Sequence, residues 1–519
     1  MLVAVIAFFL AFAAAIGLAA VYYVHMFQLE SYLPVQFSKW LLERAKSKRI
    51  LVFLPAIVAA VVTVLWRESA VAFVVGAVLL ACNAWFFRPF KAKKPLVFTP
   101  RVWRMLTTFA LICILMSVLF AVLGLCGLAP LLLPFAGFIL LLANLINRPI
   151  EKAVCNHYIK EAKNIIKARK NTLTVIGITG SYGKTSTKFF LTKLLSQKYN
   201  VLMTPASYNT TMGVVRVIRE MLKPSHEIFI CEMGARDIGE IKEICDIVLP
   251  SYGIITSIGP QHLETFKCIE NIVKTKFELG DAVGVNDHMV LNGDNRYIYD
   301  RRYSEKYTYY GMVNTKVGYF AENVATTSDG TAFTLRFPDG EVLDFTSRLI
   351  GKHNVLNILA SVAMADKFGI ERRDLVRAVK MLEPPAHRLQ IVDGGDITII
   401  DDSFNSNPSG SRSALEALSS FDGVRVLVTP GMVELGDSQS ILNYELGVSA
   451  GDFCEYIYVV GSVNYDSIYK GVLSTGFDVT RRLIRVNSPE EAIAMVRALP
   501  TSLKKIVLLE NDLPDTYNE

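Results

Sequence analysis

Gly177-Ile-Thr-Gly-Ser-Tyr-Gly-Lys-Thr-Ser186 is the stretch of this 519-residue chain that predicts a phosphate-binding loop. Residues 174–178 are apolar enough for a short buried strand, and residues 185–195 have the pattern of the helix that follows such a loop. Backbone N–H groups of the loop and the positive end of the helix would then both point at a phosphate. Ile178 stands where a strict G-x-x-x-x-G-K-[ST] pattern has glycine, so a glycine-rich turn without a ligand is the alternative.

The residues before this loop are too apolar for an ordinary soluble protein. The chain is 52% hydrophobic with a mean hydropathy of +0.35, and the excess lies in residues 1–150. Five stretches are each about long enough to cross roughly 30 Å of hydrocarbon as a helix: residues 2–24, 50–66, 70–87, 105–123 and 128–146. The second and third stretches are short, which leaves a re-entrant hairpin as the alternative for that pair.

Basic residues flank these stretches unevenly. Lysine and arginine are frequent in residues 39–49 and 88–104, whereas residues 67–69 and 124–127 have one basic residue or none. The positive-inside rule then predicts a multi-pass protein with its N-terminus outside and everything after Arg148 in the cytoplasm. A cleaved signal peptide is not expected, because the first stretch lacks a positive leading region and a small-residue cleavage site.

The net charge indicates the kind of partner, and the cysteines indicate the redox setting. The net charge of +6 comes largely from the membrane-flanking residues, which favours anionic lipid headgroups and argues against nucleic acid. None of the eight cysteines stands in a C-x-x-C pair, as expected for reduced thiols in a cytosolic and membrane setting.

The rest of the chain has the rhythm of α/β domains. Predicted strands at residues 227–232, 253–257 and 288–291 alternate with helical stretches, which is typical of a parallel sheet, and residues 316–345 are expected to form hairpins. Pro384-Pro385 marks a boundary before a second α/β segment. We therefore predict an α-helical transmembrane region, then a central P-loop ATPase domain on a parallel sheet, then a Rossmann-like C-terminal domain. The predicted divisions are residues 1–150 (membrane), 151–171 (connecting amphipathic helix), 172–386 (central) and 387–519 (C-terminal).

Chemically active side chains follow the predicted strands. Glu232 comes directly after residues 228–231, at the edge of an open parallel sheet where ligands bind. His262 follows the next strand, and Lys276 and Glu278 stand on a predicted helix. A single histidine is more often a loop or core residue than a ligand, but these residues occur together with a phosphate loop.

An ordered set of motifs resembles the Mur ligase family of peptidoglycan synthesis, and within it the branch that joins D-alanyl-D-alanine to a muropeptide. The resemblance covers roughly residues 172–515. It rests on the segments at residues 179–185, 232–235, 259–264, 292–294, 351–355, 387–389, 401–408 and 434–436.

This resemblance implies an ATP-dependent ligase at a bacterial cell membrane. Such enzymes convert a substrate carboxylate to an acyl phosphate, which an amine then attacks to form an amide. The implied catalytic residues are Lys184, Glu232, His262 and Lys276. The implied ATP contacts are Thr179, Gly180, Ser181, Tyr182, Gly183, Lys184, Thr185, Ser186, Asn292, Asn295, Arg388 and Asp402. The implied substrate contacts are Asn209, Thr210 and Thr211.

The resemblance also implies cofactors. Two Mg²⁺ ions are expected, one held by Thr185 and Glu232 and one by Glu232, His262 and Lys276. An ordinary lysine is a cation and a poor metal neighbour. Members of the family carbamylate the matching lysine, which makes it an anionic oxygen ligand, so a carbamate is implied at Lys276.

Departures from the family bear on the substrates. Membrane spans occupy the place of the domain that normally grips the uridine nucleotide, and Glu510-Asn-Asp-Leu-Pro514 stands where a Lys-Gly-Ser turn is usual. The acceptor is therefore a soluble or a lipid-linked muropeptide, joined to an amino acid or a dipeptide. The spans either present a lipid-linked acceptor or only anchor the enzyme. Membrane lipids and other cell-wall enzymes are the remaining expected partners.

Three other functions stay open. A ligase of the same family that adds a different amino acid or a glutamate chain keeps the ATP chemistry. An inactive cell-wall scaffold would have no physical need for Lys184, Glu232, His262 and Lys276 together. An ATPase that gates transport would need polar residues within the spans, where Asn83 and Asn144 are almost the only ones.

Overall fold

A computed structural model describes residues 1–46, 48–67, 69–88, 94–206, 208–261, 263–284, 286–300, 306–404, 407–433 and 435–511. For residues 43–46, 48–50 and 264 only the backbone is described. The chain divides into two compact units, Met1–Asn156 and His157–Leu513.

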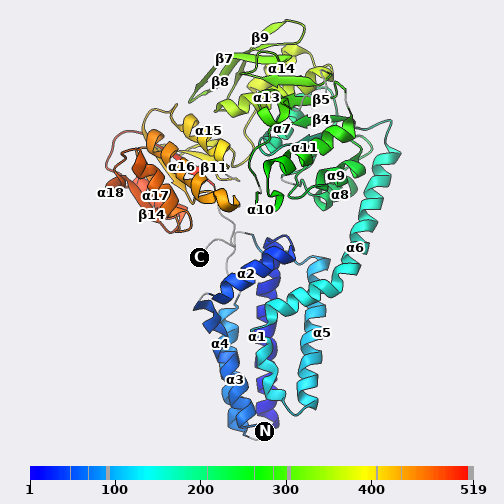
Figure 1. Ribbon diagram of the computed structural model, residues 1–519, viewed down its shortest axis with the longest axis vertical. Coiled ribbons are helices and arrows are strands. Elements are labelled where there is room, and N and C mark those ends of the chain that lie inside the picture. Colours follow the sequence, from blue (N-terminus) through cyan, green and yellow to red (C-terminus); the bar gives the residue numbers. More distant parts are fainter. Residues whose placement is uncertain are drawn as a thin grey trace. The chain divides into compact units, whose positions relative to one another are not determined.

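The first unit is built from helices (Figure 1). They are α1 (Leu2–Leu29), α2 (Pro34–Lys46), α3 (Leu54–Leu65), α4 (Ala70–Phe86), α5 (Pro100–Val122) and the start of α6 (Ala136–Ala168), with the short 3₁₀ segments η1 (Lys48–Phe53) and η2 (Cys126–Leu132). Helix α4 packs against both α1 and α3. Gly76 permits this approach, because a Cβ there would lie 2.9 Å from both Phe8 and Thr63.

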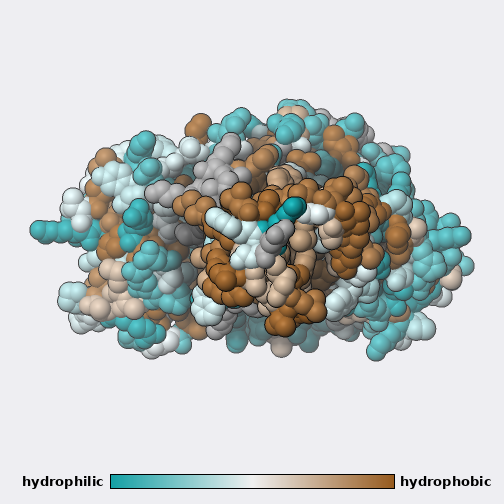
Figure 2. Space-filling view, turned by 90° about the horizontal axis from the view of Figure 1, so that it is seen from below, coloured by the Kyte–Doolittle hydropathy of each residue, from teal (hydrophilic) through white to brown (hydrophobic). Residues whose placement is uncertain are grey.

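Two of these helices, α1 and α5, are long and apolar enough to cross a membrane, and the bent pair η2 and α6 adds a third if it forms one span. The predicted second and third spans are helices α3 and α4, with 12 and 17 residues, which is short of the roughly 20 residues that a full crossing needs. The alternative of a re-entrant hairpin therefore fits helices α3 and α4 better than two full spans do. Large apolar side chains are exposed on all of these helices, and Figure 2 shows them gathered on this unit.

Helix α6 differs from its sequence-based prediction. A span ending at residue 146 and a separate helix from 151 were expected, but one helix runs from Ala136 to Ala168 with Pro149 inside it. Proline removes one backbone donor and usually kinks or ends a helix, but α6 continues through Pro149. The last turns of α6 belong to the second unit, where Ala162 and Ile166 are buried in its core.

The second unit contains a nine-stranded sheet in the order β2-β3-β1-β4-β5-β6-β7-β8-β9. Its strands are β1 (Thr174–Thr179), β2 (Val201–Met203), β3 (Ile228–Glu232), β4 (Tyr252–Ile255), β5 (Met289–Asn292), β6 (Thr308–Gly311), β7 (Tyr319–Thr327), β8 (Gly330–Arg336) and β9 (Val342–Ser347). Pairing is parallel from β2 through to β7, and β7, β8 and β9 are antiparallel. The predicted hairpins are thus confirmed.

Helices cover both faces of this sheet. They are α7 (Lys184–Leu195), α8 (Thr211–Glu220), α9 (Glu240–Val248), α10 (Leu263–Phe266), α11 (Ile269–Val283), α12 (Arg296–Tyr299), α13 (Lys352–Lys367) and α14 (Arg372–Lys380). Ile228 and Ile230 of β3 pack in the core formed with α7, α13 and α14. Phe229 and Cys231 pack in the core formed with α8, α9 and α11. A strand buried on both faces explains this continuous apolar run.

A six-stranded sheet in the order β10-β11-β15-β12-β13-β14 forms the C-terminal part. Its strands are β10 (Gln390–Asp393), β11 (Ile397–Asp402), β12 (Val424–Thr429), β13 (Tyr456–Val460), β14 (Leu483–Val486) and β15 (Lys505–Glu510). Its helices are α15 (Pro408–Leu418), η3 (Gly436–Ser438), α16 (Gln439–Phe453), α17 (Tyr465–Ser474), α18 (Val479–Arg482) and α19 (Pro489–Arg497). All pairs except β10 with β11 are parallel. The predicted fold class is confirmed.

Candidate active site

The phosphate loop connects β1 to α7, as the sequence predicts. Gly180 and Gly183 have φ values of +149° and +81°, and a Cβ at either position would collide with the side chain of Thr256 or Asn357, respectively. Neighbouring backbone holds the loop in place, because the Ser181 N–H donates to the Ser257 carbonyl at 2.6 Å. Only glycine fits at both positions. The N–H groups of the loop lie close to the start of α7, where a phosphate would bind.

Other predicted nucleotide contacts within the loop are held by hydrogen bonds. The Tyr182 hydroxyl donates to the Pro260 carbonyl at 2.6 Å, and the Thr179 hydroxyl donates to the Met233 carbonyl at 2.9 Å. Ser186 is buried in the first turn of α7. Lys184 Nζ donates to the carbonyls of Gly180 and Ser181 at 2.7 and 3.1 Å, and burial lowers its pKa to about 8. The ammonium group is thus held against the loop that would cradle a phosphate.

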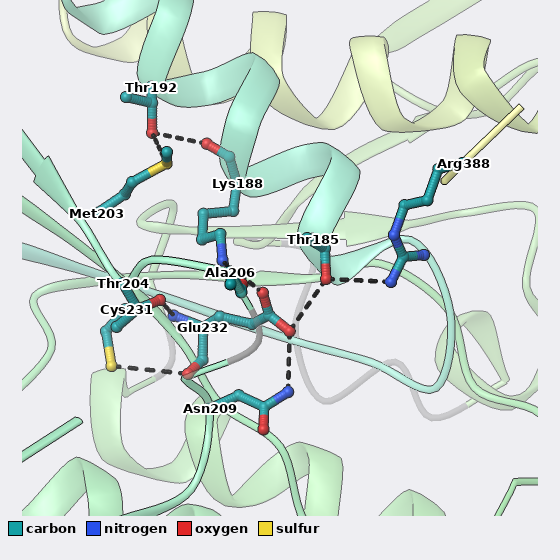
Figure 3. A network of polar contacts seen from close by, with 10 residues as sticks. All are labelled: Thr185, Lys188, Thr192, Met203, Thr204, Ala206, Asn209, Cys231, Glu232 and Arg388. Carbon is teal, nitrogen blue, oxygen red and sulfur yellow. Dashed lines mark hydrogen bonds and ion pairs between the residues drawn. The ribbon is translucent and has the colours of Figure 1, made fainter. Parts of the chain in front are cut away.

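Glu232 lies at the centre of a polar network at the carboxyl end of β3 (Figure 3). Its Oε1 accepts from the Thr185 hydroxyl at 3.2 Å and from Asn209 Nδ2 at 3.0 Å. Its Oε2 pairs with Lys188 Nζ at 2.8 Å. Burial favours the neutral acid, but the positive charges of Lys188 and Lys184 outweigh it and lower the pKa of Glu232. The buried side chain is therefore a carboxylate.

The predicted substrate segment is only partly directed at this network. Asn209 reaches Glu232, whereas Thr210 caps α8 by accepting from the Gly213 N–H at 3.4 Å. Thr211 donates to Glu243 of α9 at 2.7 Å, on an exposed surface. The structure thus brings one of the three predicted substrate residues to the phosphate loop.

Asn292, the last residue of β5, and Asn295, three residues later, are two of the predicted ATP contacts. Asn292 Nδ2 donates to the Thr256 carbonyl at 2.8 Å, and Asn295 Nδ2 donates to the Ile258 carbonyl at 2.9 Å. Among the described residues, Asn295 Oδ1 is buried without a hydrogen-bond donor. An orphaned acceptor is costly, and a hydroxyl or amino group of a bound nucleoside is a suitable partner for it.

Arg388 and Asp402 come from beyond the central sheet. Arg388 Nη2 lies 3.4 Å from the Thr185 hydroxyl, and the guanidinium lies over the Phe404 ring. Asp402 Oδ1 accepts from the Leu389 N–H at 3.1 Å, and burial raises the pKa of Asp402 to about 6. His387 and Leu389, on either side of Arg388, have φ values of +61° and +49°. This strained connection directs the guanidinium at the phosphate loop.

The predicted second metal position is described in part. His262 lies outside the described residues. Lys276 is buried in α11, and burial together with the charge of Lys184 lowers its pKa to about 7. No group of three or more histidine, cysteine, aspartate or glutamate side chains that could hold a metal occurs among the residues the structure describes. The pair Thr185 Oγ1 and Glu232 Oε1 has the oxygen ligands that Mg²⁺ prefers when phosphates complete its coordination.

Two buried residues at this site escaped sequence-based prediction. Lys188 lies one turn of α7 beyond Lys184, and a lysine within an apolar helical run was the signal available. Asn357 of α13 accepts from the Thr187 hydroxyl at 3.3 Å and lies against Gly183. Its position just beyond residues 351–355 was the only sequence signal.

Two family models match the chain. The model of the Mur ligase middle domain matches residues 178–365, and the model described as the Mur ligase, glutamate ligase domain matches residues 387–509. The two matches coincide with the two sheets and the helices around them.

Individual proteins are similar over the same region. The UDP-N-acetylmuramoyl-tripeptide–D-alanyl-D-alanine ligase of Synechocystis is 30% identical over 64% of this chain and 70% of its own length. The ligase of the same name from Bacillus subtilis is 30% identical over 56% of this chain and 63% of its own length. The chain thus spans a little under two thirds of the latter protein.

Solved structures share the fold. The MurF ligase of Thermotoga maritima in complex with ADP superposes with a TM-score of 0.61 at 24% identity, over 69% of this chain and 80% of that one.

Proposed function

We propose that this chain, which belongs to the Mur ligase family, is an ATP-dependent ligase that forms an amide bond in peptidoglycan synthesis. The observation that carries the proposal is that Glu232 and Arg388, from two other parts of the second unit, both meet Thr185 of the phosphate loop. The ligase names of the relatives and the ADP bound to the Thermotoga protein support it.

The proposed reaction has two steps. A carboxylate oxygen of the acceptor attacks the γ-phosphorus of ATP. ADP is expelled, and the acceptor carboxylate becomes an acyl phosphate. The amine nitrogen then attacks the carbonyl carbon, loses a proton and expels phosphate. Both steps place negative charge on oxygens, which the positive charges of Lys184 and Arg388 at the phosphate loop would stabilise. Asn292, Asn295 and Asp402 would hold the nucleoside between the central and C-terminal domains, whose closure would exclude water from the acyl phosphate.

Mg²⁺ fits one end of this site. Thr185 and Glu232 would hold one ion, and Glu232, His262 and a carbamylated Lys276 would hold a second. When bound, such ions neutralise charge on the phosphate oxygens. The division into residues 172–386 and 387–519, with the linker at 151–171 and the membrane domain at 1–150, is part of the same proposal.

Carbamylation of Lys276 is a testable element of this site. Carbon dioxide reacts with a neutral amine, and the lowered pKa of about 7 leaves much of Lys276 neutral at cytoplasmic pH. We expect a carbamate signal in ¹³C NMR spectra of protein equilibrated with ¹³C-bicarbonate. The signal should decrease from about pH 8 to about pH 6, because protonation below the pKa removes the nucleophile.

Matched variants assign that signal. Lys276→Met should lose it, whereas Lys274→Met, which changes an exposed lysine on the same helix, should keep it. A signal that persists in Lys276→Met would refute carbamylation at this position.

The apolar helices support a membrane location for the enzyme. We propose a multi-pass protein of the bacterial cell membrane, with its N-terminus outside and its ligase domains in the cytoplasm, in contact with lipids and with other cell-wall enzymes. The acceptor is a soluble or a lipid-linked muropeptide, and the amine is D-alanyl-D-alanine or a related amino acid or dipeptide. With a soluble acceptor the helices serve as an anchor, and with a lipid-linked acceptor they form part of the acceptor site.

ADP release by the full-length protein in detergent or nanodiscs tests the reaction and both acceptors. D-alanyl-D-alanine is offered with either a nucleotide-linked or a lipid-linked muropeptide. Turnover with the lipid-linked acceptor alone would assign the helical unit to substrate binding, and equal turnover with both would make it an anchor. No ADP release with either acceptor, across a panel of amines that includes glutamate, would overturn the proposed ligase activity.

A different amine is the second candidate. The C-terminal match is to a domain described as a glutamate ligase domain. The end of β15 also carries Glu510 in place of the usual Lys-Gly-Ser turn, and Ser411 donates to Glu510 at 2.7 Å. Turnover with glutamate but not with the dipeptide would favour this candidate.

A further inference from the structure

Lys188 is an unusual residue for its position. Its side chain is completely buried between α7 and the carboxyl end of β3. Nζ contacts Glu232 Oε2 at 2.8 Å and the Ala206 carbonyl at 2.5 Å. A buried ammonium is costly unless it is paired and hydrogen-bonded, and these two partners meet that requirement. Lys188 therefore connects the helix of the phosphate loop to two other segments.

The contacts of Glu232 are divided between its two oxygens. Lys188 occupies Oε2, whereas Oε1 faces Thr185 and Asn209 (Figure 3). Without Lys188 the carboxylate would have no described cationic partner on its Oε2 side. The lysine thus holds one oxygen of the carboxylate, so that the other remains on the side of the phosphate loop.

The second contact reaches the segment that carries Asn209. Ala206 has a φ of +42°, a conformation that is costly for any residue with a Cβ. Such strain persists only where neighbouring contacts enforce it, and the Lys188 ammonium on the Ala206 carbonyl is one such contact. Asn209, three residues later, donates to the same carboxylate.

An ion pair that only stabilised the fold would not need to lie beside the phosphate loop. Well-packed apolar side chains of similar size often stabilise a protein as much as a buried ion pair does, and the surrounding core is apolar. The pair is instead placed beside Thr185, and its carboxylate is shared with the phosphate loop.

We propose that Lys188 is a positioning residue that holds Glu232 Oε2, so that Oε1 faces Thr185 and Asn209 to receive a divalent cation, and that it ties Ala206 to the nucleotide site. This inference rests on the proposed function, because it assumes that Thr185 and Glu232 hold the cation of a bound nucleotide.

Binding of Mn²⁺ and ADP to the full-length protein tests the proposal without any turnover. Mn²⁺ stands in for Mg²⁺ and is measured by electron paramagnetic resonance, and ADP is measured by calorimetry with and without a chelator. In Lys188→Met we expect Mn²⁺ affinity in the presence of ADP to fall at least about 10-fold, the usual effect of removing an outer partner of a metal ligand. Metal-free ADP affinity should stay within about twofold.

Matched variants complete this experiment. Lys193→Met changes an exposed lysine on the same helix and should bind Mn²⁺ as the wild type does. Lys188→Gln keeps N–H donors for Glu232 and Ala206 and should therefore lose less Mn²⁺ affinity than Lys188→Met. Lys188→Leu, which also lacks a donor, replaces Lys188→Met if that variant does not fold. Amide hydrogen exchange around Ala206 should also accelerate in the Lys188 variants.

The outcomes separate two failures. Wild-type Mn²⁺ affinity in a folded Lys188→Met or Lys188→Leu variant, neither of which has a side-chain N–H donor, would overturn the role of Lys188 and leave the proposed function intact. A wild-type protein that binds neither ADP nor Mn²⁺ would overturn the nucleotide site itself, and with it the proposed function.

Discussion

Replacing Lys184 by alanine is expected to reduce ATP-dependent turnover by roughly 10³-fold or more. The reason is that the Lys184 ammonium group of the phosphate loop neutralises charge on the outer phosphates. The fold should survive. Among the described residues, Lys184 donates hydrogen bonds only to the carbonyls of Gly180 and Ser181 in its own loop, and Glu232, which loses the positive charge of Lys184, keeps its ion pair with Lys188. ADP release by full-length protein measures the effect.

A matched control and a cellular assay complete this prediction. Lys193→Ala, on the exposed side of α7, should turn over at the wild-type rate. If a strain that carries only Lys184→Ala grows as well as the wild type while the purified variant is inactive, the chain acts as a scaffold and the ligase proposal fails in the cell.

Replacing Glu232 by glutamine is expected to damage both activity and stability. The change removes the carboxylate from Thr185 and Asn209 and leaves the Lys188 ammonium buried without its counter-charge. Breaking a buried ion pair on one side costs about 3–5 kcal/mol. We expect turnover to be lost and the central domain to unfold more readily than in the wild type.

The probe for this loss must report on the second unit. All four tryptophans, Trp40, Trp66, Trp85 and Trp103, lie in the first unit, so intrinsic tryptophan fluorescence is unsuitable. Amide hydrogen exchange in β1 and β3 is the appropriate measurement, and an acceleration of roughly 100-fold or more corresponds to the expected loss.

The double variant Glu232→Gln with Lys188→Met isolates the cause. Removing the ammonium as well should restore much of the protection in β1 and β3, because no buried charge is then left unpaired. Protection in Glu232→Gln equal to that of the wild type would contradict the account of Glu232 as a buried carboxylate held by Lys188.

Local patterns predicted much of the fold. The strand, loop and helix around residues 174–195 were correctly predicted, because glycine placement and an apolar run determine that unit within a few residues. The hairpins of β7, β8 and β9 followed from turn residues at Asp329-Gly330 and Asp339-Gly340. The boundary of α6 was missed, because proline usually ends a helix, whereas α6 continues through Pro149.

The residues of the candidate site were likewise predicted in part and missed in part. Lys184 and Thr185 were predicted as site residues because they are adjacent to the glycines that shape the loop, and Glu232 was predicted because it ends a strand in a parallel sheet. Asn357 and Lys188 were missed, since a buried polar residue within a helical run looks like any other until its partner is known.

The sequence by itself determined that this protein has an apolar helical region, a phosphate loop and two α/β domains, because each depends on residues that are neighbours in the chain. Only the tertiary structure decided how the site is assembled. Lys188 meets a carboxylate 44 residues away, and Arg388 meets a hydroxyl 203 residues away. Contacts over such separations depend on strand order and domain packing. Local sequence patterns carry no signal for which oxygen of Glu232 each partner takes.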